Sequence, residues 1–208
     1  MLFRSALLER CQAALGDNRP LRQLDLDADE EKRIRGFQFL SQKPILYVLN
    51  LGEDEAGNLR EREREYREGA LAGRKRSAAA AVCGKVEAEL AELPAAEQRE
   101  YLSSYGLEES GLQRLITATY SLLGLMSFLT AGEDEVRAWT IPAHSTAVKA
   151  AGAIHSDFEK KFIRAEVVNW KSLVDLGGYA GAREKGLLRL EGKEYIVKDG
   201  DVLVIRHG

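Results

Sequence analysis

Two short apolar runs, separated by a highly charged stretch, constrain the fold of this chain more than any other feature. Residues 45–49 form the first run, directly after Lys43-Pro44, and residues 78–82 form the second. Continuous apolar runs of this length are typical of parallel strands that are buried on both faces. The Arg- and Glu-rich stretch 58–73 lies between them and has the i, i+4 charge pairs of a solvated helix. The order strand, helix, strand predicts a βαβ unit of an open α/β sheet.

Polar residues follow both predicted strands, at the edge of an α/β sheet where ligands usually bind. They are Asn50, Leu51 and Glu53 after the first strand, and Cys83, Gly84 and Lys85 after the second. An Asn amide can donate to and accept from a purine edge, a carboxylate can accept from an amino group, and a Gly-containing loop lets backbone amides approach the ring. An ordinary turn is the alternative, and local chemistry alone favours it because Asn and Gly are common in turns.

Motifs for complete catalytic sites are absent from the 208 residues. The sequence contains no G-x-x-x-x-G-K-[ST] phosphate loop, which a P-loop nucleoside triphosphatase requires. It also contains no nucleophile elbow with a Ser, His and Asp order, and no Cys with a supporting His nearby. The three histidines and two cysteines lack the spacing of metal ligands, so no metal site is predicted.

Charge and hydropathy argue against a nucleic-acid or membrane partner for the chain as a whole. Thirty Lys and Arg against 33 Asp and Glu give a net charge of -3, so the chain has no overall positive field for a phosphate backbone. Any RNA contact must therefore be local, and no specific DNA partner is expected. The longest apolar stretch, 122–129, is too short to cross a bilayer, so no membrane partner is expected. The distant cysteines Cys11 and Cys83 suggest a reducing cytoplasm.

Helical patterns surround the predicted βαβ unit. Apolar residues at Phe3, Leu7, Cys11 and Ala14 to Leu15 predict an amphipathic helix that has no matching partner in the first 40 residues. The chain is therefore expected to begin within a helical hairpin. Asp27 and Glu30 have capping-box spacing and predict a helix to about Leu40. Residues 86–93 and 112–123 have the apolar spacing of two further helices.

The pattern changes near residues 124–127, where a boundary between two domains is expected. Short strand-like segments then alternate with Gly-containing turns, at 136–141, 162–168, 187–190, 195–197 and 202–205. This pattern predicts a small α+β domain.

A basic cluster in this second domain is a candidate partner site. His155 lies near Lys160, Lys161 and Arg164, and Phe158 is available for stacking on a base. These residues would form a basic edge that contacts RNA or another protein. The favoured alternative is a capped turn with Phe158 in the core and the lysines in water.

Several longer segments match one protein family. They are residues 43–50, 87–93, 122–125, 135–140, 150–158, 162–167, 191–197 and 199–202. On these segments the chain resembles the C-terminal part of the YchF family, the Obg-related P-loop ATPases. The resemblance implies that 1–25 end a coiled-coil hairpin, 26–124 are the C-terminal part of the α/β nucleotide-binding domain, and 125–208 form a TGS domain of β-grasp, ubiquitin-like fold.

The resemblance also implies roles for individual residues. The family's base-recognition motif is Asn-x-x-Glu, which places Asn50, Leu51 and Glu53 at a nucleotide base with a preference for ATP. Cys83-Gly84-Lys85 stands where the family usually has Ser-Ala-Lys. The phosphate loop and the Mg²⁺ ligands of the family belong to a part upstream of these residues. His144 stands where the family usually has Gly, so a positive φ there would strain it.

The implied partner is the ribosome, and two kinds of function fit. The chain is either the back half of a translation-associated ATPase, inactive in hydrolysis alone, or a stand-alone TGS module that docks on the ribosome or a regulatory partner. In both cases the N-terminal half of this chain is expected to expose apolar surface and a strand edge. Such a surface favours either pairing with the missing upstream half of the family's protein or self-association.

Overall fold

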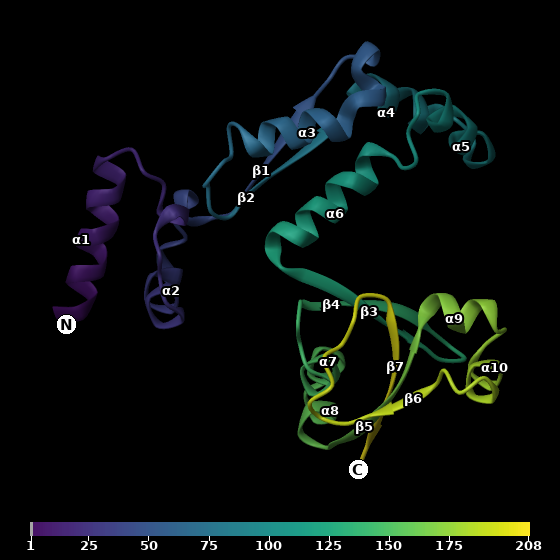
Figure 1. The fold of residues 1–208 in the computed structure, drawn as a ribbon. Coiled ribbons are helices and arrows are strands. Elements are labelled where there is room, and N and C mark those ends of the chain that lie inside the picture. The colour runs from purple at the N-terminus through teal and green to yellow at the C-terminus, as the bar shows by residue number, and fades with distance from the viewer. Residues whose placement is uncertain (1) are drawn as a thin grey trace. The chain divides into compact units, whose positions relative to one another are not determined.

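The computed structural model describes residues 2–208, with side chains from Ala6 onward, so the Phe3 side chain of the predicted stripe lies outside the described part (Figure 1). The chain divides into two compact units. Unit 1 ends at Leu123, and unit 2 is Gly124–Gly208.

Unit 1 begins with helices held by a small core of their own. In α1 (Leu2–Gly16), the predicted stripe is confirmed at Leu7, Cys11 and Ala14, which are buried, whereas Leu15 is exposed. These side chains pack against Leu21, in the 3-10 turn η1 (Leu21–Gln23), and against Ile34.

The second helix, α2 (Ala28–Ile34), opens with the predicted capping box between Asp27 and Glu30. It ends at Ile34 rather than near Leu40, so the predicted length is wrong. Gly36 follows, and Gln38 has a positive φ of 53°, a left-handed conformation that an α-helix cannot continue through. The segment instead forms two 3-10 turns, η2 (Arg35–Phe37) and η3 (Leu40–Gln42).

The predicted βαβ unit is confirmed. It consists of β1 (Ile45–Asn50), α3 (Leu59–Glu68) and β2 (Ser77–Val82), with the turn η4 (Glu53–Asn58) before the helix. The two strands are parallel and pair from Ile45 opposite Ser77 to Asn50 opposite Val82.

Burial differs between the two strands, and the prediction that β1 is buried on both faces is wrong. Residues 79–82 of β2 are buried, whereas Val48 of β1 is 49% exposed. The reason is position. β2 packs closely against both α3 and α6 (Gly111–Leu123), whereas β1 packs closely against α6 but not against α3.

An ion pair and a helix cap join the remaining elements of unit 1. Arg114 of α6 donates from Nη2 to Glu63 Oε2 of α3 at 2.6 Å and from Nε to the carbonyl of Ala81 in β2 at 3.2 Å. The Glu87 carboxylate of α4 (Gly84–Glu92) accepts from the Gly111 amide at 2.6 Å, at the N-terminus of α6. Between α4 and α6 lies α5 (Ala95–Ser104), a helix that the sequence patterns did not indicate.

Unit 2 is a five-stranded mixed sheet with the strand order β4-β3-β7-β5-β6. Its strands are β3 (Leu125–Ala131), β4 (Val136–Pro142), β5 (Phe162–Asn169), β6 (Arg189–Glu191) and β7 (Asp201–His207). Its helices are α7 (Ala147–Ile154), α8 (Ser156–Lys160), α9 (Trp170–Asp175) and α10 (Tyr179–Glu184). Only the β3 and β7 pair is parallel; the other neighbours are antiparallel.

One face of this sheet packs on α7 and forms the main core. Phe128, Ala165 and Val167 are fully buried there, together with Ala147 and Ala150 of the helix. The α+β character predicted for this part of the chain is therefore observed.

The strands of unit 2 agree with most of the segments predicted from the sequence. The strands predicted at 136–141, 162–168 and 202–205 are present, and 187–190 shortens to β6. The strand predicted at 195–197 is reduced to a single antiparallel bridge, between Ile196 and Thr146. Its backbone bonds to the turn before α7, with the Ala147 amide donating to the carbonyl of Tyr195 and the Val197 amide to that of Ser145. His144, in the same turn, has a φ of 63°, so the strain expected there is real.

Candidate base-binding site

The carboxyl ends of β1 and β2 lie side by side because the strands are parallel and paired to their last residues. The Asn50 side-chain oxygen accepts a hydrogen bond from the backbone amide of Gly84 at 2.9 Å. The Leu51 amide donates to the carbonyl of Val82, also at 2.9 Å. A Cβ atom at position 84 would lie 3.0 Å from Asn50 Oδ1, so glycine allows the two loops to approach this closely.

A second contact joins the same two loops through charged side chains. Lys85, in the first turn of α4, donates from Nζ to Glu53 Oε2 at 2.6 Å, and Glu53 is the first residue of η4. The hydrogen bond and charge of Glu53 raise the pKa of Lys85. Both side chains are partly exposed, 64% for Lys85 and 37% for Glu53, so water screens the pair. The contact therefore positions the two groups more than it stabilises the fold.

The two remaining predicted residues differ in exposure. Cys83 is 2% exposed and packs with Ala56 and Val86, so its thiol belongs to the core. Its carbonyl accepts from the Glu87 amide and starts α4. Leu51 is half-buried. The structure thus brings Asn50, Glu53, Gly84 and Lys85 together at the surface and turns Cys83 away from it.

Two tyrosines support these loops, Tyr101 in α5 and Tyr105 at its C-cap, and sequence reasoning missed both. Tyr101 and Tyr105 pack on the core cluster that contains Cys83, and their ring centroids are 5.3 Å apart. The Tyr101 hydroxyl donates to the Glu89 carboxylate of α4, which raises the pKa of Tyr101. Their i, i+4 spacing was the available signal, but it needed α5 to be recognised as a helix.

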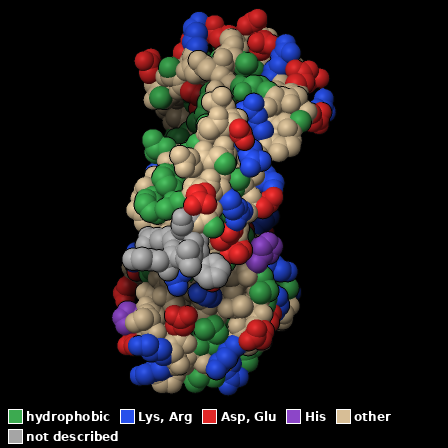
Figure 2. Space-filling model, turned by 90° about the vertical axis from the view of Figure 1, so that its left-hand side faces the viewer, with side chains coloured by type: hydrophobic (Ala, Val, Ile, Leu, Met, Phe, Trp, Pro, Cys, Tyr) green, Lys and Arg blue, Asp and Glu red, His purple; other side chains and the backbone are tan. Residues whose placement is uncertain are grey.

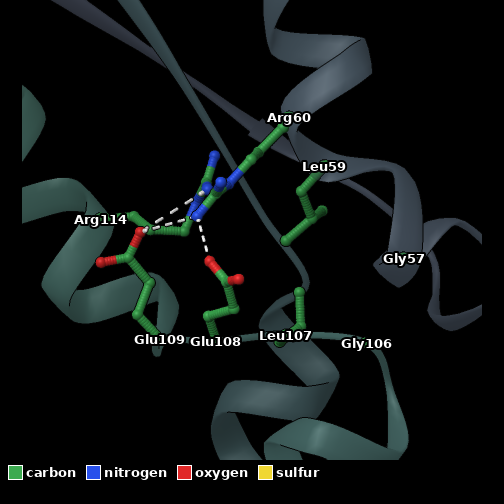
Figure 3. A pocket seen from close by; sticks show the side chains of 8 residues that line it. All are labelled: Gly57, Leu59, Arg60, Gly106, Leu107, Glu108, Glu109 and Arg114. Carbon is green, nitrogen blue, oxygen red and sulfur yellow. Dashed lines mark hydrogen bonds and ion pairs between the residues drawn. The ribbon is translucent and has the colours of Figure 1, made fainter.

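A small pocket lies next to η4 but is distinct from the base loops (Figure 3). It measures about 160 Å³ and is lined by Gly57, Leu59, Arg60, Gly106, Leu107, Glu108, Glu109 and Arg114. Arg60 donates from Nη2 to Glu108 Oε2 at 2.8 Å, and Glu109 lies within 4.0 Å of both arginines. The charges of this pocket are therefore paired with one another, which leaves no net charge for a ligand ion.

In residues 2–208 no group of three or more His, Cys, Asp or Glu side chains has the arrangement of a metal site. No helix of the described chain is long and apolar enough to span a membrane.

The basic cluster predicted in unit 2 lies on α8 and the start of β5. His155 precedes α8, and its Nδ1 accepts from the Asp157 amide at 3.2 Å. All four predicted residues, His155, Lys160, Lys161 and Arg164, are exposed. Arg164 pairs in register with Arg206 of β7, which adds a cationic side chain that the sequence alone did not place there.

Charges of both signs are mixed on the face of the molecule that Figure 2 shows. Figure 2 shows Lys and Arg side chains interspersed with Asp and Glu over the face in view. This distribution agrees with the small net charge of -3.

Comparisons with known proteins point to one family. Residues 125–208 match the family model described as "YchF-GTPase_C: Protein of unknown function (DUF933)". A protein of Bacillus subtilis named "Ribosome-binding ATPase YchF" is 43% identical over 205 residues, which are 99% of this chain and 56% of the relative. The protein of the same name from Escherichia coli O157:H7 is 46% identical over 200 residues, 95% of this chain and 54% of the relative.

A solved structure shows the same relationship in three dimensions. The Schizosaccharomyces pombe YchF GTPase superposes with a TM-score of 0.73 at 28% identity, over 97% of this chain and 53% of that one. The chain thus spans about half the length of the relatives that it matches.

Proposed function

Because the chain corresponds to the C-terminal part of the YchF family, we propose that it carries the base-recognition half of an ATP site and a ribosome-binding module. In this proposal residues 26–124 are the C-terminal part of the nucleotide-binding domain, after the end of a hairpin at 1–25. Residues 125–208 are a TGS domain of β-grasp fold. The observation that carries the proposal is the convergence of Asn50, Glu53, Gly84 and Lys85 at the ends of two parallel strands.

The donors and acceptors of this cluster fit a purine base. The Asn50 side-chain oxygen already accepts from the Gly84 amide. The side-chain nitrogen of Asn50 is therefore the group that can donate to a ring nitrogen of the base. Glu53 supplies a carboxylate acceptor for an exocyclic amino group. Leu51 contributes apolar surface between the two.

The ion pair favours adenine over guanine. Guanine presents two adjacent donors, N1 and N2, which suit both oxygens of one carboxylate. Lys85 already donates to Glu53 Oε2, so Oε1 is the less engaged oxygen and the better acceptor for the base. Adenine has a single exocyclic amino group and needs a single acceptor. The cofactor we propose is therefore ATP, with GTP bound more weakly.

Hydrolysis is a separate matter from base recognition. The triphosphate of an NTPase is held by a phosphate loop and Mg²⁺. The 208 residues contain no phosphate-loop motif, and no metal-ligand group occurs in the described part. We therefore expect base-dependent binding of ATP and no measurable turnover by this chain alone.

The site can be tested by nuclear magnetic resonance on the ¹⁵N-labelled chain. ATP at millimolar concentration should shift the Gly84 and Lys85 amide signals more than GTP or CTP does. Glu53→Gln should reduce that difference between nucleotides, whereas Asp54→Asn, on the exposed neighbouring carboxylate, should leave it unchanged. Equal shifts with all three nucleotides would contradict the base site.

The ribosome-binding proposal is supported by the printed names of the relatives and by the exposed basic residues of unit 2. Unit 2 has a core of its own, which also favours the alternative of a TGS module that binds without catalysis. Both proposals require unit 2 to dock on the ribosome, and co-sedimentation with ribosomes tests this. The double variant Lys160→Glu with Lys161→Glu should weaken co-sedimentation, whereas the control variant Lys193→Glu with Lys198→Glu should not. A cytoplasmic location goes with this proposal, since Cys11 and Cys83 are both free thiols.

A further inference from the structure

A groove opens in unit 2 where two neighbouring strands separate. β3 and β7 are parallel, but a single register pair, Leu129 with Val202, joins them. β3 continues for two residues beyond Leu129, into the hairpin with β4, and β7 continues to His207. The space between the hairpin and β7 measures about 400 Å³.

The walls of the groove are apolar and aromatic. Trp139, Ile154 and Phe158 line one side, and Leu203 and Ile205 of β7 line the other. The indole nitrogen of Trp139 donates to Thr130 Oγ1 at 2.9 Å, so its only polar atom is satisfied inside the protein. The Arg137 guanidinium lies 4.1 Å from the centroid of the Trp139 ring and covers part of it, so an occupant meets the part of the ring that lines the groove, without leaving the indole donor unpaired.

The rim of the groove is acidic. Glu133, Asp134 and Glu135 form the tip of the β3–β4 hairpin, and all three line the groove and are exposed. No ion pair is recorded for any of them within residues 2–208, although the surface carries many other ion pairs. Three carboxylates that form no ion pair within the described chain, beside an apolar slot, attract cations and repel a phosphate backbone.

We propose that this groove binds an extended, Lys- or Arg-rich segment of a protein partner. Apolar side chains of the segment would fill the slot between Trp139 and Leu203, and its cationic side chains would contact the hairpin tip. The part of β7 beyond Val202 that faces the hairpin has no strand partner among the described residues, so an extended backbone can add to it. The inference goes beyond the proposed function, because it assigns a protein partner to residues outside both the base site and the basic cluster.

Fluorescence of Trp139 provides a direct readout. The sequence has two tryptophans, so Trp170→Phe leaves Trp139 as the sole reporter. The probe is a synthetic twelve-residue peptide of alternating Lys and Leu, with an alternating Glu and Leu peptide and oligouridylate as competitors of other chemistry. We expect the basic peptide to change Trp139 emission saturably, and the acidic peptide to bind at least about tenfold more weakly.

The rim is tested by a triple variant, Glu133→Gln, Asp134→Asn and Glu135→Gln, which should weaken the basic peptide about tenfold or more. Its matched control is Asp175→Asn, Glu184→Gln and Glu194→Gln, which changes the net charge equally at exposed positions outside the groove and should leave binding unchanged. Both sets are exposed, so circular dichroism should show both variants folded. Equal loss in the two variants, equal binding of the acidic peptide, or displacement of the basic peptide by oligouridylate would each overturn the proposal.

Discussion

The two units of this protein bury their apolar residues in different ways. Unit 2 has a large main core that draws on β3, β4, β5, β7 and α7, and a smaller cluster of Val168, Ala182 and Val202 that shares β5 and β7 with it. The buried residues of unit 1 fall into separate small clusters, one around α1 and one around Cys83. The sheet of unit 1 has two strands, and that of unit 2 has five. Unit 2 is therefore expected to unfold as one cooperative body, while unit 1 depends on dispersed contacts and on the ion pairs that join its elements.

The largest effect is expected from a cavity in the unit 2 core. Phe128 is fully buried, so Phe128→Ala should lower the free energy of unfolding of unit 2 by about 3–5 kcal/mol. Native-state hydrogen exchange should show faster exchange for all core amides of unit 2 together. Val136→Ala, at a 72% exposed position of the same sheet, is the control and should change little. Faster exchange restricted to β3 would show that the core is less cooperative than we infer.

In unit 1 the largest single contribution should come from an ion pair. The side chains of Arg114 and Glu63 are 10% and 21% exposed, and Arg114→Met would leave the Glu63 carboxylate without its closest cation. We expect a loss of about 2–3 kcal/mol in denaturant unfolding. The matched change Arg60→Met removes a pair whose side chains are 70% and 80% exposed, and should cost less than about 0.5 kcal/mol. Similar losses for both would mean that unit 1 does not rely on the buried pair.

A third difference concerns association. Leu112, Ile116 and Leu123 lie at helical spacing on α6 and are 62%, 50% and 49% exposed. We expect concentration-dependent self-association of the chain through unit 1 in sedimentation velocity, and Leu112→Glu with Ile116→Glu should reduce it. Val174→Glu, at a 68% exposed site of unit 2, should not. A monodisperse monomer at high concentration would contradict this expectation.

The smallest effect lies in the turn before α7. His144 has a φ of 63°, so His144→Gly should relieve strain and raise the stability of unit 2 by about 0.5–1 kcal/mol, after the entropy that glycine adds to the unfolded chain. Gly186→Ala, at a φ of 67° in the same unit, should have the opposite sign. Thermal unfolding measures both, and a lower midpoint for His144→Gly would show that the imidazole stabilises the turn.

Local patterns predicted the parts of the fold that local forces determine. The capping box at Asp27, the charged helix α3 and both strands of the βαβ unit follow from neighbouring residues. Tertiary context decided the rest. Residues 195–197 have a strand-like composition but bond to the turn before α7, and β3 was missed because its sequence, Leu125–Ala131, overlaps the predicted boundary.

The candidate site shows the same division. The sequence placed polar residues at the ends of two strands, and parallel pairing was enough to bring them together. The sequence did not show that Lys85 holds Glu53, or that Cys83 faces the core, because both depend on how α4 sits against η4. Tyr101 and Tyr105 were missed because α5, which contains the first and ends at the second, has no strong apolar periodicity.

Arg114 binds β2 and α3 at once, which restricts the substitutions that the sequence can accept at this position. Its Nε reaches the Ala81 carbonyl while its Nη2 reaches Glu63. A lysine has one cationic nitrogen and cannot serve both directions, so even the most conservative replacement loses a contact. Loss of either charged partner leaves the other with a longer contact only, Glu63 with Arg67 at 3.6 Å or Arg114 with Glu109 at 4.0 Å. Substitutions at positions 63 and 114 are therefore tolerated mainly in pairs, and homologous sequences should exchange the two charged residues for neutral ones together.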